Sequence, residues 1–106
     1  MRRRTHKSVI EDIRKLVRLT GGDATVLAQS ARLYGTAGTP DLYLRWPKKM
    51  LTAWMEVKVE GDKLSPAQAA WIEAEEDAGG QVLVGDTDVL IGWMACHMVC
   101  WEVGDD

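Results

Sequence analysis

Long apolar runs and a cysteine framework are both missing from this chain. No stretch approaches the roughly 18 consecutive apolar residues of a membrane span, and the basic start at residues 1–7 leads into an amphipathic pattern rather than a signal-peptide core. The two cysteines, Cys96 and Cys100, lie four residues apart in an apolar segment. That spacing is typical of buried residues on one helical face, not of a disulfide framework. We therefore expect a cytoplasmic protein with no membrane partner.

Internal repeats, low-complexity tracts and linkers are also absent from the sequence. A length of 106 residues allows one hydrophobic core, and a content of 46% hydrophobic and 27% charged residues is typical of a folded domain. We therefore predict a single domain over residues 1–106.

Basic residues are nearly absent from the C-terminal part of the chain. Residues 60–106 hold eleven acidic side chains and the single base Lys63, whereas residues 1–20 hold seven basic side chains and two acidic ones. This asymmetry predicts a basic face that meets phosphates, although an N-terminal arm that is simply solvated fits the same charges. The candidate phosphate-binding residues are Arg2, Arg3, Arg4, Lys48 and Lys49.

The first half of the chain has the pattern of a helix followed by strands. Apolar residues recur at helical spacing over residues 7–19, and the pair Gly21-Gly22 marks the end of that helix. A short apolar run over residues 24–30 predicts a first strand. Two more strands, over residues 41–46 and 52–59, are joined by a turn at 47–49. We expect the three strands to form an antiparallel meander.

The second half alternates helix and strand. Ser65 as N-cap and Pro66 at the first helical position begin a helix that Gly79-Gly80 ends. Residues 81–85 predict a fourth strand, parallel to the third because a helical crossover joins them. The element order predicts a compact α/β domain with a mixed central sheet. Small residues around one aromatic form a stripe on the middle helix that we expect to lie flat on the sheet: Ala67, Ala70, Trp71, Ala74 and Ala78.

The last predicted helix, from Val89 to about Trp101, is apolar nearly all round. Such a helix must be covered on more than one side, and in a small domain some of that cover can come from a second subunit. The residues expected at this contact are Trp93, Met94, Met98 and Trp101.

Chemically informative residues lie in the second and third predicted strands. Pro40 precedes Asp41 at the start of one strand, and Glu56 and Lys58 alternate along the next. Residues i and i+2 of a strand share a face, so we expect Trp54, Glu56 and Lys58 to lie together, with the charged pair at a rim. If the two strands pair as a hairpin, Asp41 lies beside Glu56. Two carboxylates and an ammonium can gather a divalent metal and a phosphate, although Glu-x-Lys is also the pattern of an ordinary surface ion pair.

Two further polar residues have an ordinary interpretation on spacing alone. Glu11 in the first helix can pair with Arg14 and Lys15, three and four residues later. Gln68 lies in the first turn of the middle helix, where a solvated side chain is equally expected.

Taken together, these motifs resemble the VRR-NUC domain of the PD-(D/E)xK nuclease superfamily over residues 7–85. The motifs are Glu11 in a first helix, Gly38-x-Pro40-Asp41, Glu56-x-Lys58 and the stretch Gly61-Asp62-Lys63-Leu64-Ser65-Pro66-Ala67-Gln68, which carries an inserted aspartate. The chain is most similar to small standalone members from phages and bacteria. The resemblance implies a restriction-endonuclease-like core, dependence on Mg²⁺ or Mn²⁺ and cleavage of DNA phosphodiesters.

The resemblance also implies roles for particular residues. Asp41, Glu56 and Lys58 would be catalytic with Gln68 in support, and the metal ligands would be Glu11, Asp41, Glu56 and the Val57 carbonyl. Lys58 can either orient the attacking water or stabilise developing charge, and the sequence leaves both open. Standalone members are associated with four-way (Holliday) DNA junctions and with homodimers. We therefore predict a metal-dependent, structure-selective DNA endonuclease acting as a homodimer in a bacterial or phage-infected cell.

Two alternatives from other classes stay open at this point. One is a non-catalytic DNA-binding or assembly module on the same fold. The other is a zinc-stabilised module that uses His6, Cys96, His97 and Cys100.

Overall fold

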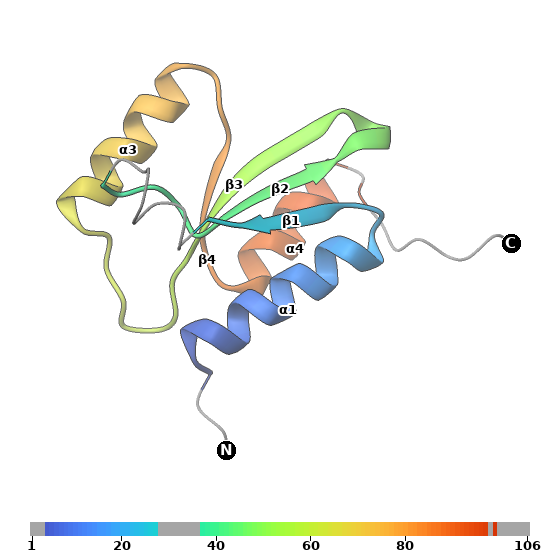
Figure 1. Cartoon of the computed structure of the whole chain (residues 1–106), viewed down its shortest axis with the longest axis horizontal. Coiled ribbons are helices and arrows are strands. Elements are labelled where there is room, and N and C mark those ends of the chain that lie inside the picture. The colour runs from blue at the N-terminus through green and yellow to red at the C-terminus, as the bar shows by residue number, and fades with distance from the viewer. Residues whose placement is uncertain (1–3, 28–36, 98, 100–106) are drawn as a thin grey trace, which may run out of the picture.

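A four-stranded mixed sheet with helices on both of its faces organises the chain (Figure 1). The computed structural model describes residues 4–27, 37–97 and 99. β1 pairs antiparallel with β2, β2 pairs antiparallel with β3, and β3 pairs parallel with β4. The predicted meander, the parallel fourth strand and the α/β class are therefore confirmed. The elements in chain order are α1 (His6–Leu19), β1 (Asp23–Val26), β2 (Leu42–Trp46), the 3-10 helix η1 (Pro47–Lys49), β3 (Leu51–Val57), α3 (Pro66–Asp77), β4 (Val82–Gly85) and α4 (Thr87–Cys96).

Some element boundaries differ from the predicted ones. β1 ends at Val26, and residues 28–30 of the predicted strand lie outside the described residues. α4 begins at Thr87, directly after its N-cap Asp86, and ends at Cys96 instead of continuing toward Trp101. No helix in the described part of the chain is long and apolar enough to cross a membrane.

The hydrophobic core lies between the sheet and the pair α1 and α4, which Figure 1 shows together on one side of the strands. Side chains of β2 alternate between buried and more exposed positions, as a strand with one covered face requires. The apolar side of β2 and β3 therefore faces α1 and α4. The buried core side chains include Val9, Ile13 and Val17 of α1, Leu42, Leu44 and Trp46 of β2, Met55 and Val57 of β3, and Leu90 and Met94 of α4.

The expected subunit contact on the last helix is wrong for Met94. This side chain is only 5% exposed and packs in the core of its own chain. Trp93 is partly buried and packs against the rings of Trp46 and His97. Met98 and Trp101, the other two residues of that prediction, lie outside the described residues.

The other face of the sheet is covered by α3, but not through the predicted alanine stripe. Ala67, Ala70, Ala74 and Ala78 are exposed, so that part of the prediction is wrong. α3 contacts the sheet through larger and polar side chains instead: the ring of Trp71 lies 5.0 Å from that of Trp54, and Glu75 accepts a 3.0 Å hydrogen bond from the Trp54 indole. α3 has no buried residue of its own.

A close backbone approach fixes the start of α3 against the loop that leads into β2. Gly38 has φ +91°, and a Cβ added there would overlap the Ala67 carbonyl in the first turn of α3. Only glycine therefore allows this approach, which brings the turn before Asp41 against α3.

We predict that Gly38→Ala destabilises the domain by more than the backbone conformation alone explains. Gly61 has almost the same φ, +92°, but an added Cβ there meets nothing within 4 Å. Gly61→Ala should therefore lower the free energy of unfolding by about 1 kcal/mol, the cost of a left-handed residue with a side chain. Gly38→Ala should cost clearly more in urea unfolding, and equal losses in the two variants would contradict the close contact.

Candidate active site

The predicted convergence of two carboxylates occurs where the β2–β3 hairpin opens. In the antiparallel register Leu42 lies opposite Met55, which places Asp41 beside Glu56 at the next position. The Val57 N–H donates a 2.9 Å hydrogen bond to Oδ2 of Asp41. The pairing that the sequence predicted between Asp41 and Glu56 is thus confirmed.

Glu56 and Lys58 lie on the face that α3 covers, where Gln68 joins them. The Glu56 carboxylate accepts a 3.0 Å hydrogen bond from Nε2 of Gln68, and Lys58 Nζ lies 3.5 Å from the same oxygen, Oε2. Lys58 also donates to Oε1 of Gln68 at 3.0 Å. Glu56 is only 3% exposed, so the prediction that this charged pair lies at a rim is wrong for the glutamate.

Gln68 has two roles at once. Its Oε1 accepts the Ser65 N–H at 2.8 Å, which completes the capping box at the start of α3, and it also accepts from Lys58. Its Nε2 is then left to donate to Glu56. Because two donors surround one end of the amide and a carboxylate faces the other, the network determines the orientation of the amide group. Gln68 is thus part of the cluster and not a freely solvated helix residue.

Electrostatics makes Glu56 the unusual group of this cluster. Burial, and next the charge of Asp41, raise the pKa of Glu56 to about 7 from an ordinary value of 4.5, while Lys58 acts in the opposite direction. Two acids this close disfavour simultaneous ionisation unless a cation joins them. A positive ion between the two carboxylates would remove this conflict.

The first helix contributes a histidine, not the expected glutamate. His6 Nε2 lies 3.2 Å from Oδ2 of Asp41, whereas Glu11 is exposed and pairs with Arg14 at 3.4 Å. Five residues of α-helix correspond to a rotation of about 140° from the direction of His6, so Glu11 points away from the site. The expectation that Glu11 is a metal ligand is therefore not supported. Sequence reasoning missed His6 at this site, and its only signal was helical spacing from the buried Val9 and Ile13.

The donor set suits a hard cation with few protein ligands. In the described part of the chain, no group of three or more His, Cys, Asp and Glu side chains is arranged to hold a metal ion. Asp41 and Glu56 remain as a pair, and the Val57 carbonyl directly follows Glu56 in the sequence. Mg²⁺ commonly uses one or two carboxylates and completes its shell with water and substrate phosphate, so two acids fit such an ion.

The zinc alternative loses its ligand set. His6 contacts Asp41 at the start of α1, whereas Cys96 is exposed and unpaired and His97 packs on Trp93 at the end of α4. Cys100 lies outside the described residues. The described members of the set therefore do not form a zinc site.

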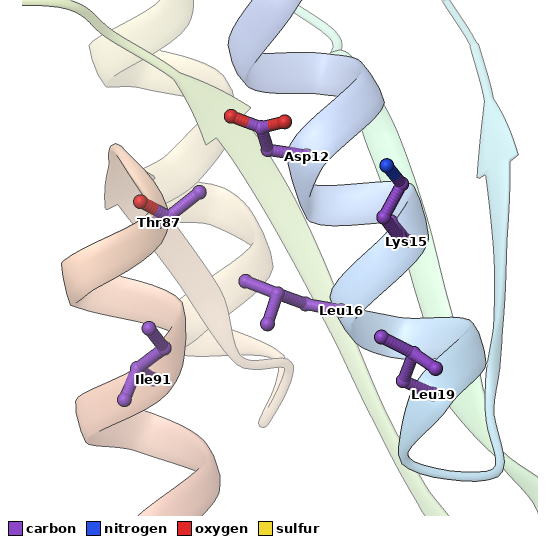
Figure 2. Close-up of a pocket in the computed structure, with 6 residues that line it drawn as sticks. All are labelled: Asp12, Lys15, Leu16, Leu19, Thr87 and Ile91. Carbon is purple, nitrogen blue, oxygen red and sulfur yellow. The ribbon is translucent and has the colours of Figure 1, made fainter.

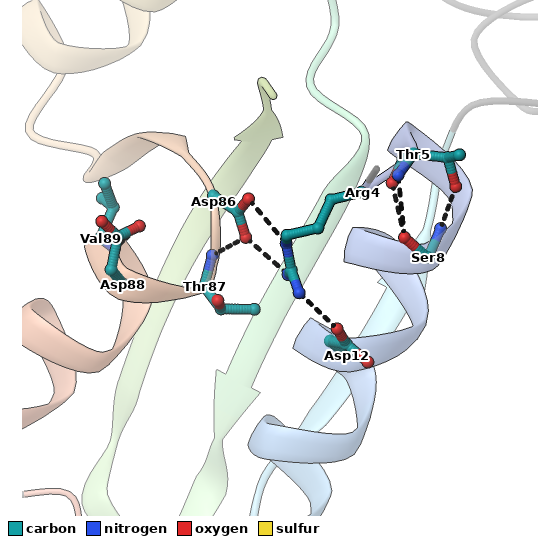
Figure 3. Close-up of polar contacts among 8 residues, drawn as sticks. All are labelled: Arg4, Thr5, Ser8, Asp12, Asp86, Thr87, Asp88 and Val89. Atoms are coloured by element: carbon teal, nitrogen blue, oxygen red, sulfur yellow. Dashed lines mark hydrogen bonds and ion pairs between the residues drawn. The ribbon is translucent and has the colours of Figure 1, made fainter. Parts of the chain in front are cut away.

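Of the five predicted phosphate-binding residues, Arg4 is already engaged by acids. Figure 3 shows its guanidinium bound to Asp86 at the start of α4 and to Asp12 of α1, with N–O distances of 2.8 and 3.2 Å. The hydrogen bond from Arg4 lowers the pKa of Asp86. Arg4 thus ties α1 to α4, so its predicted phosphate contact is not supported. Lys48 and Lys49 are exposed in η1, and Arg2 and Arg3 lie outside the described residues.

A mixed α/β sheet that presents an acid at the start of one strand, and a Glu-x-Lys pair at the end of its neighbour, defines the class of restriction-endonuclease-like nucleases. The family model of the VRR-NUC domain matches residues 7–87, and the chain belongs to this family. It is therefore a nuclease-type domain that acts on DNA. The comparisons with curated proteins and with solved structures each returned no match.

We predict that Glu56 makes the stability of the metal-free protein depend on pH. Its pKa is raised in the folded state, so between pH 4.5 and about 7 the folded protein holds a proton that the unfolded chain has lost. The free energy of unfolding should therefore fall as the pH rises through this window, by at most roughly 3–4 kcal/mol at about 1.4 kcal/mol per pH unit. Urea unfolding in the presence of a chelator measures this slope.

The Glu56→Gln variant isolates the contribution of Glu56, because it keeps the shape and removes the titration. Relative to this variant, the wild type should lose stability over the window, while the exposed control Glu73→Gln should follow the wild type. If the free energy of unfolding of the wild type and of Glu56→Gln changed equally with pH between 4.5 and about 7, this result would contradict the raised pKa of Glu56.

Proposed function

We propose that this domain is a metal-dependent, structure-selective DNA endonuclease that cleaves phosphodiester bonds at branched DNA, such as four-way junctions, as a homodimer. The observation that carries the proposal is the cluster in which Asp41, buried Glu56, Lys58 and Gln68 meet at the open end of one hairpin. The preference for branched DNA rests on the similarity to standalone VRR-NUC members.

Asp41 and Glu56 would hold the cation, which we expect to be Mg²⁺ or Mn²⁺. Their adjacent carboxylates, the Val57 carbonyl and the unfavourable charge on buried Glu56 all favour binding of a hard divalent ion. When bound, such an ion supplies charge neutralisation at the phosphate and a water of lowered pKa.

Lys58 would act on the attacking water or on the phosphate. Its side chain is 18% exposed, and its ammonium is held between Glu56 and the amide of Gln68. Two fixed acceptors leave the third N–H of the ammonium to point toward a substrate. A preorganised cation of this kind can stabilise the charge that develops on the phosphate. Gln68 is then a positioning residue, because it holds both Glu56 and Lys58.

Lys48 and Lys49 would contact the DNA backbone at the far end of the same hairpin. They precede β3, whereas Glu56 lies near its end, so the seven residues of this strand separate them by about 20 Å. A duplex that contacts both would extend over roughly six base pairs at 3.4 Å each. Such contacts strengthen binding without reading sequence.

A second copy of the chain would pack on the groove between α1 and α4. Figure 2 shows Leu16, Leu19 and Ile91 lining this groove, with Asp12, Lys15 and Thr87 completing the lining. Leu19 and Ile91 are 49% and 50% exposed. Exposing large apolar side chains together at one site is unfavourable in water and is typical of a protein–protein contact. A twofold contact here would leave the α3 face of each sheet open to DNA. This groove replaces Trp93 and Met94 as the expected dimer contact.

The direct test of activity is cleavage of linear, flapped and four-way DNA by the purified protein with Mg²⁺ or Mn²⁺. We expect the four-way substrate to be cut fastest and a chelator to stop the reaction. Glu56→Ala and Lys58→Ala should each lower the rate at least about 100-fold, because each removes a preorganised charge at the reacting phosphate.

The matched controls are Glu60→Ala and Arg18→Ala, which remove a charge of the same sign at exposed positions outside the cluster and outside the groove lining. They should cleave like the wild type. Equal residual cleavage by the cluster and control variants would remove the assignment of the site. DNA binding without cleavage, indifferent to metal and to Asp41→Ala, would instead favour a non-catalytic module.

Sedimentation measures the proposed dimer. The wild type should sediment as a dimer and Ile91→Asp as a monomer, because the new charge would be buried against the second copy. Met50→Asp places the same charge at the 93% exposed tip of the hairpin and should leave the dimer intact. A dimeric Ile91→Asp would place the contact on another surface.

A further inference from the structure

Among the described residues at the cluster, the histidine at the start of α1 is the one for which neither the motifs nor the proposed reaction accounts. His6 is the first residue of the helix, after the N-cap Thr5, and its side chain is 46% exposed. Its Nε2 lies 3.2 Å from Oδ2 of Asp41, a residue 35 positions away in the sequence. A half-exposed side chain adds little to the core, so its position is not explained by packing.

Among the described residues, both N–H donors that contact the Asp41 carboxylate fall on the same oxygen. Oδ2 accepts the Val57 N–H at 2.9 Å and faces His6 Nε2 at 3.2 Å. A carboxylate oxygen only accepts, so Nε2 carries the hydrogen in this contact. In the described part of the chain, no N–H group donates to Oδ1, and the remaining neighbour of the carboxylate is the Glu56 carboxyl, which hydrogen-bonds with Asp41. The two donors therefore fix the plane of the carboxylate and leave Oδ1 available to a cation beside Glu56.

We propose that His6 is a positioning residue that orients Asp41 for cation binding. The first helix would then serve the cation site through His6 and not through Glu11, which the resemblance assigned as a metal ligand. The inference rests on the proposed function in one respect, that a divalent cation binds at Asp41 and Glu56. When a carboxylate binds a metal through one oxygen, removing a hydrogen-bond donor to its other oxygen typically lowers the metal affinity by 10–100-fold. His6 acts through Asp41 and is not itself a ligand, since its imidazole donates to the carboxylate.

The test measures binding of Mn²⁺ alone to the full chain by calorimetry, without DNA. His6→Ala should weaken Mn²⁺ binding by about 10-fold or more, because Asp41 loses one of its two orienting donors. His6→Gln places an amide N–H at a similar reach and should restore most of the affinity. Lys7→Ala, at the neighbouring exposed position of the same helix, is the matched control and should bind like the wild type.

Pulsed electron paramagnetic resonance of the Mn²⁺-loaded wild type separates positioning from direct ligation. A positioning His6 gives no signal from a directly bound imidazole nitrogen, whereas such a signal would overturn the proposal. Unchanged Mn²⁺ affinity in His6→Ala would overturn it as well, and so would a failure of His6→Gln to recover affinity.

The outcomes for the inference and for the proposed nuclease function are distinguishable. A wild type that binds Mn²⁺ in a His6-dependent way but cuts no DNA would support the inference and contradict the nuclease proposal. If His6→Ala cut DNA like the wild type and bound Mn²⁺ with unchanged affinity, the nuclease proposal would be supported and the inference about His6 contradicted. A wild type that binds no Mn²⁺ would overturn the inference together with the proposed metal dependence.

Discussion

The cluster of Asp41, Glu56, Lys58 and Gln68 depends on one hydrogen bond, which the backbone N–H of Val57 donates to the Asp41 carboxylate. It forms where the ladder between β2 and β3 stops, so that a side-chain oxygen takes the place of the next backbone acceptor. The acid is thereby attached to the strand that carries Glu56. Because side chains alternate between faces, a register shift of one residue would turn Glu56 toward the core and separate the two acids. The same pairing that builds the sheet therefore assembles the site.

Local patterns predicted the elements that this pairing requires. Alternation over residues 52–59 assigned Glu56 and Lys58 to one face and Val57 to the other, as the structure has them. The cap of α3 at Ser65 and its start at Pro66 were equally visible, because capping depends on a few adjacent residues. The hairpin followed from the short connection between the two strands. These features lie within about thirty residues of one another, where sequence spacing constrains geometry well.

Contacts between distant segments could not be predicted in the same way. His6 meets Asp41 across 35 residues, and Arg4 meets Asp86 across 82 residues. Each contact depends on where α1 lies on the sheet. Hydrophobic periodicity predicts which face of the helix is buried, but not how far the helix is shifted along its own axis. The side of α3 that faces the sheet is also not predictable from its alanine stripe, because small residues suit close packing on many surfaces and here they are exposed. Here two side-chain hydrogen bonds determine which side of α3 faces the sheet: Trp54 donates to Glu75, and Gln68 donates to Glu56.

The double role of Gln68 joins the cluster of Asp41, Glu56 and Lys58 to α3, a helix without a buried residue. α3 buries no residue, and the amide that closes its first turn also holds Glu56 and Lys58. Fraying of that turn would therefore disassemble the cluster while the core under α1 and α4 stays folded, since local opening needs less free energy than global unfolding. The fraction of molecules in which the cluster is assembled thus depends on the first turn of α3, and amide exchange at that turn reports this fraction.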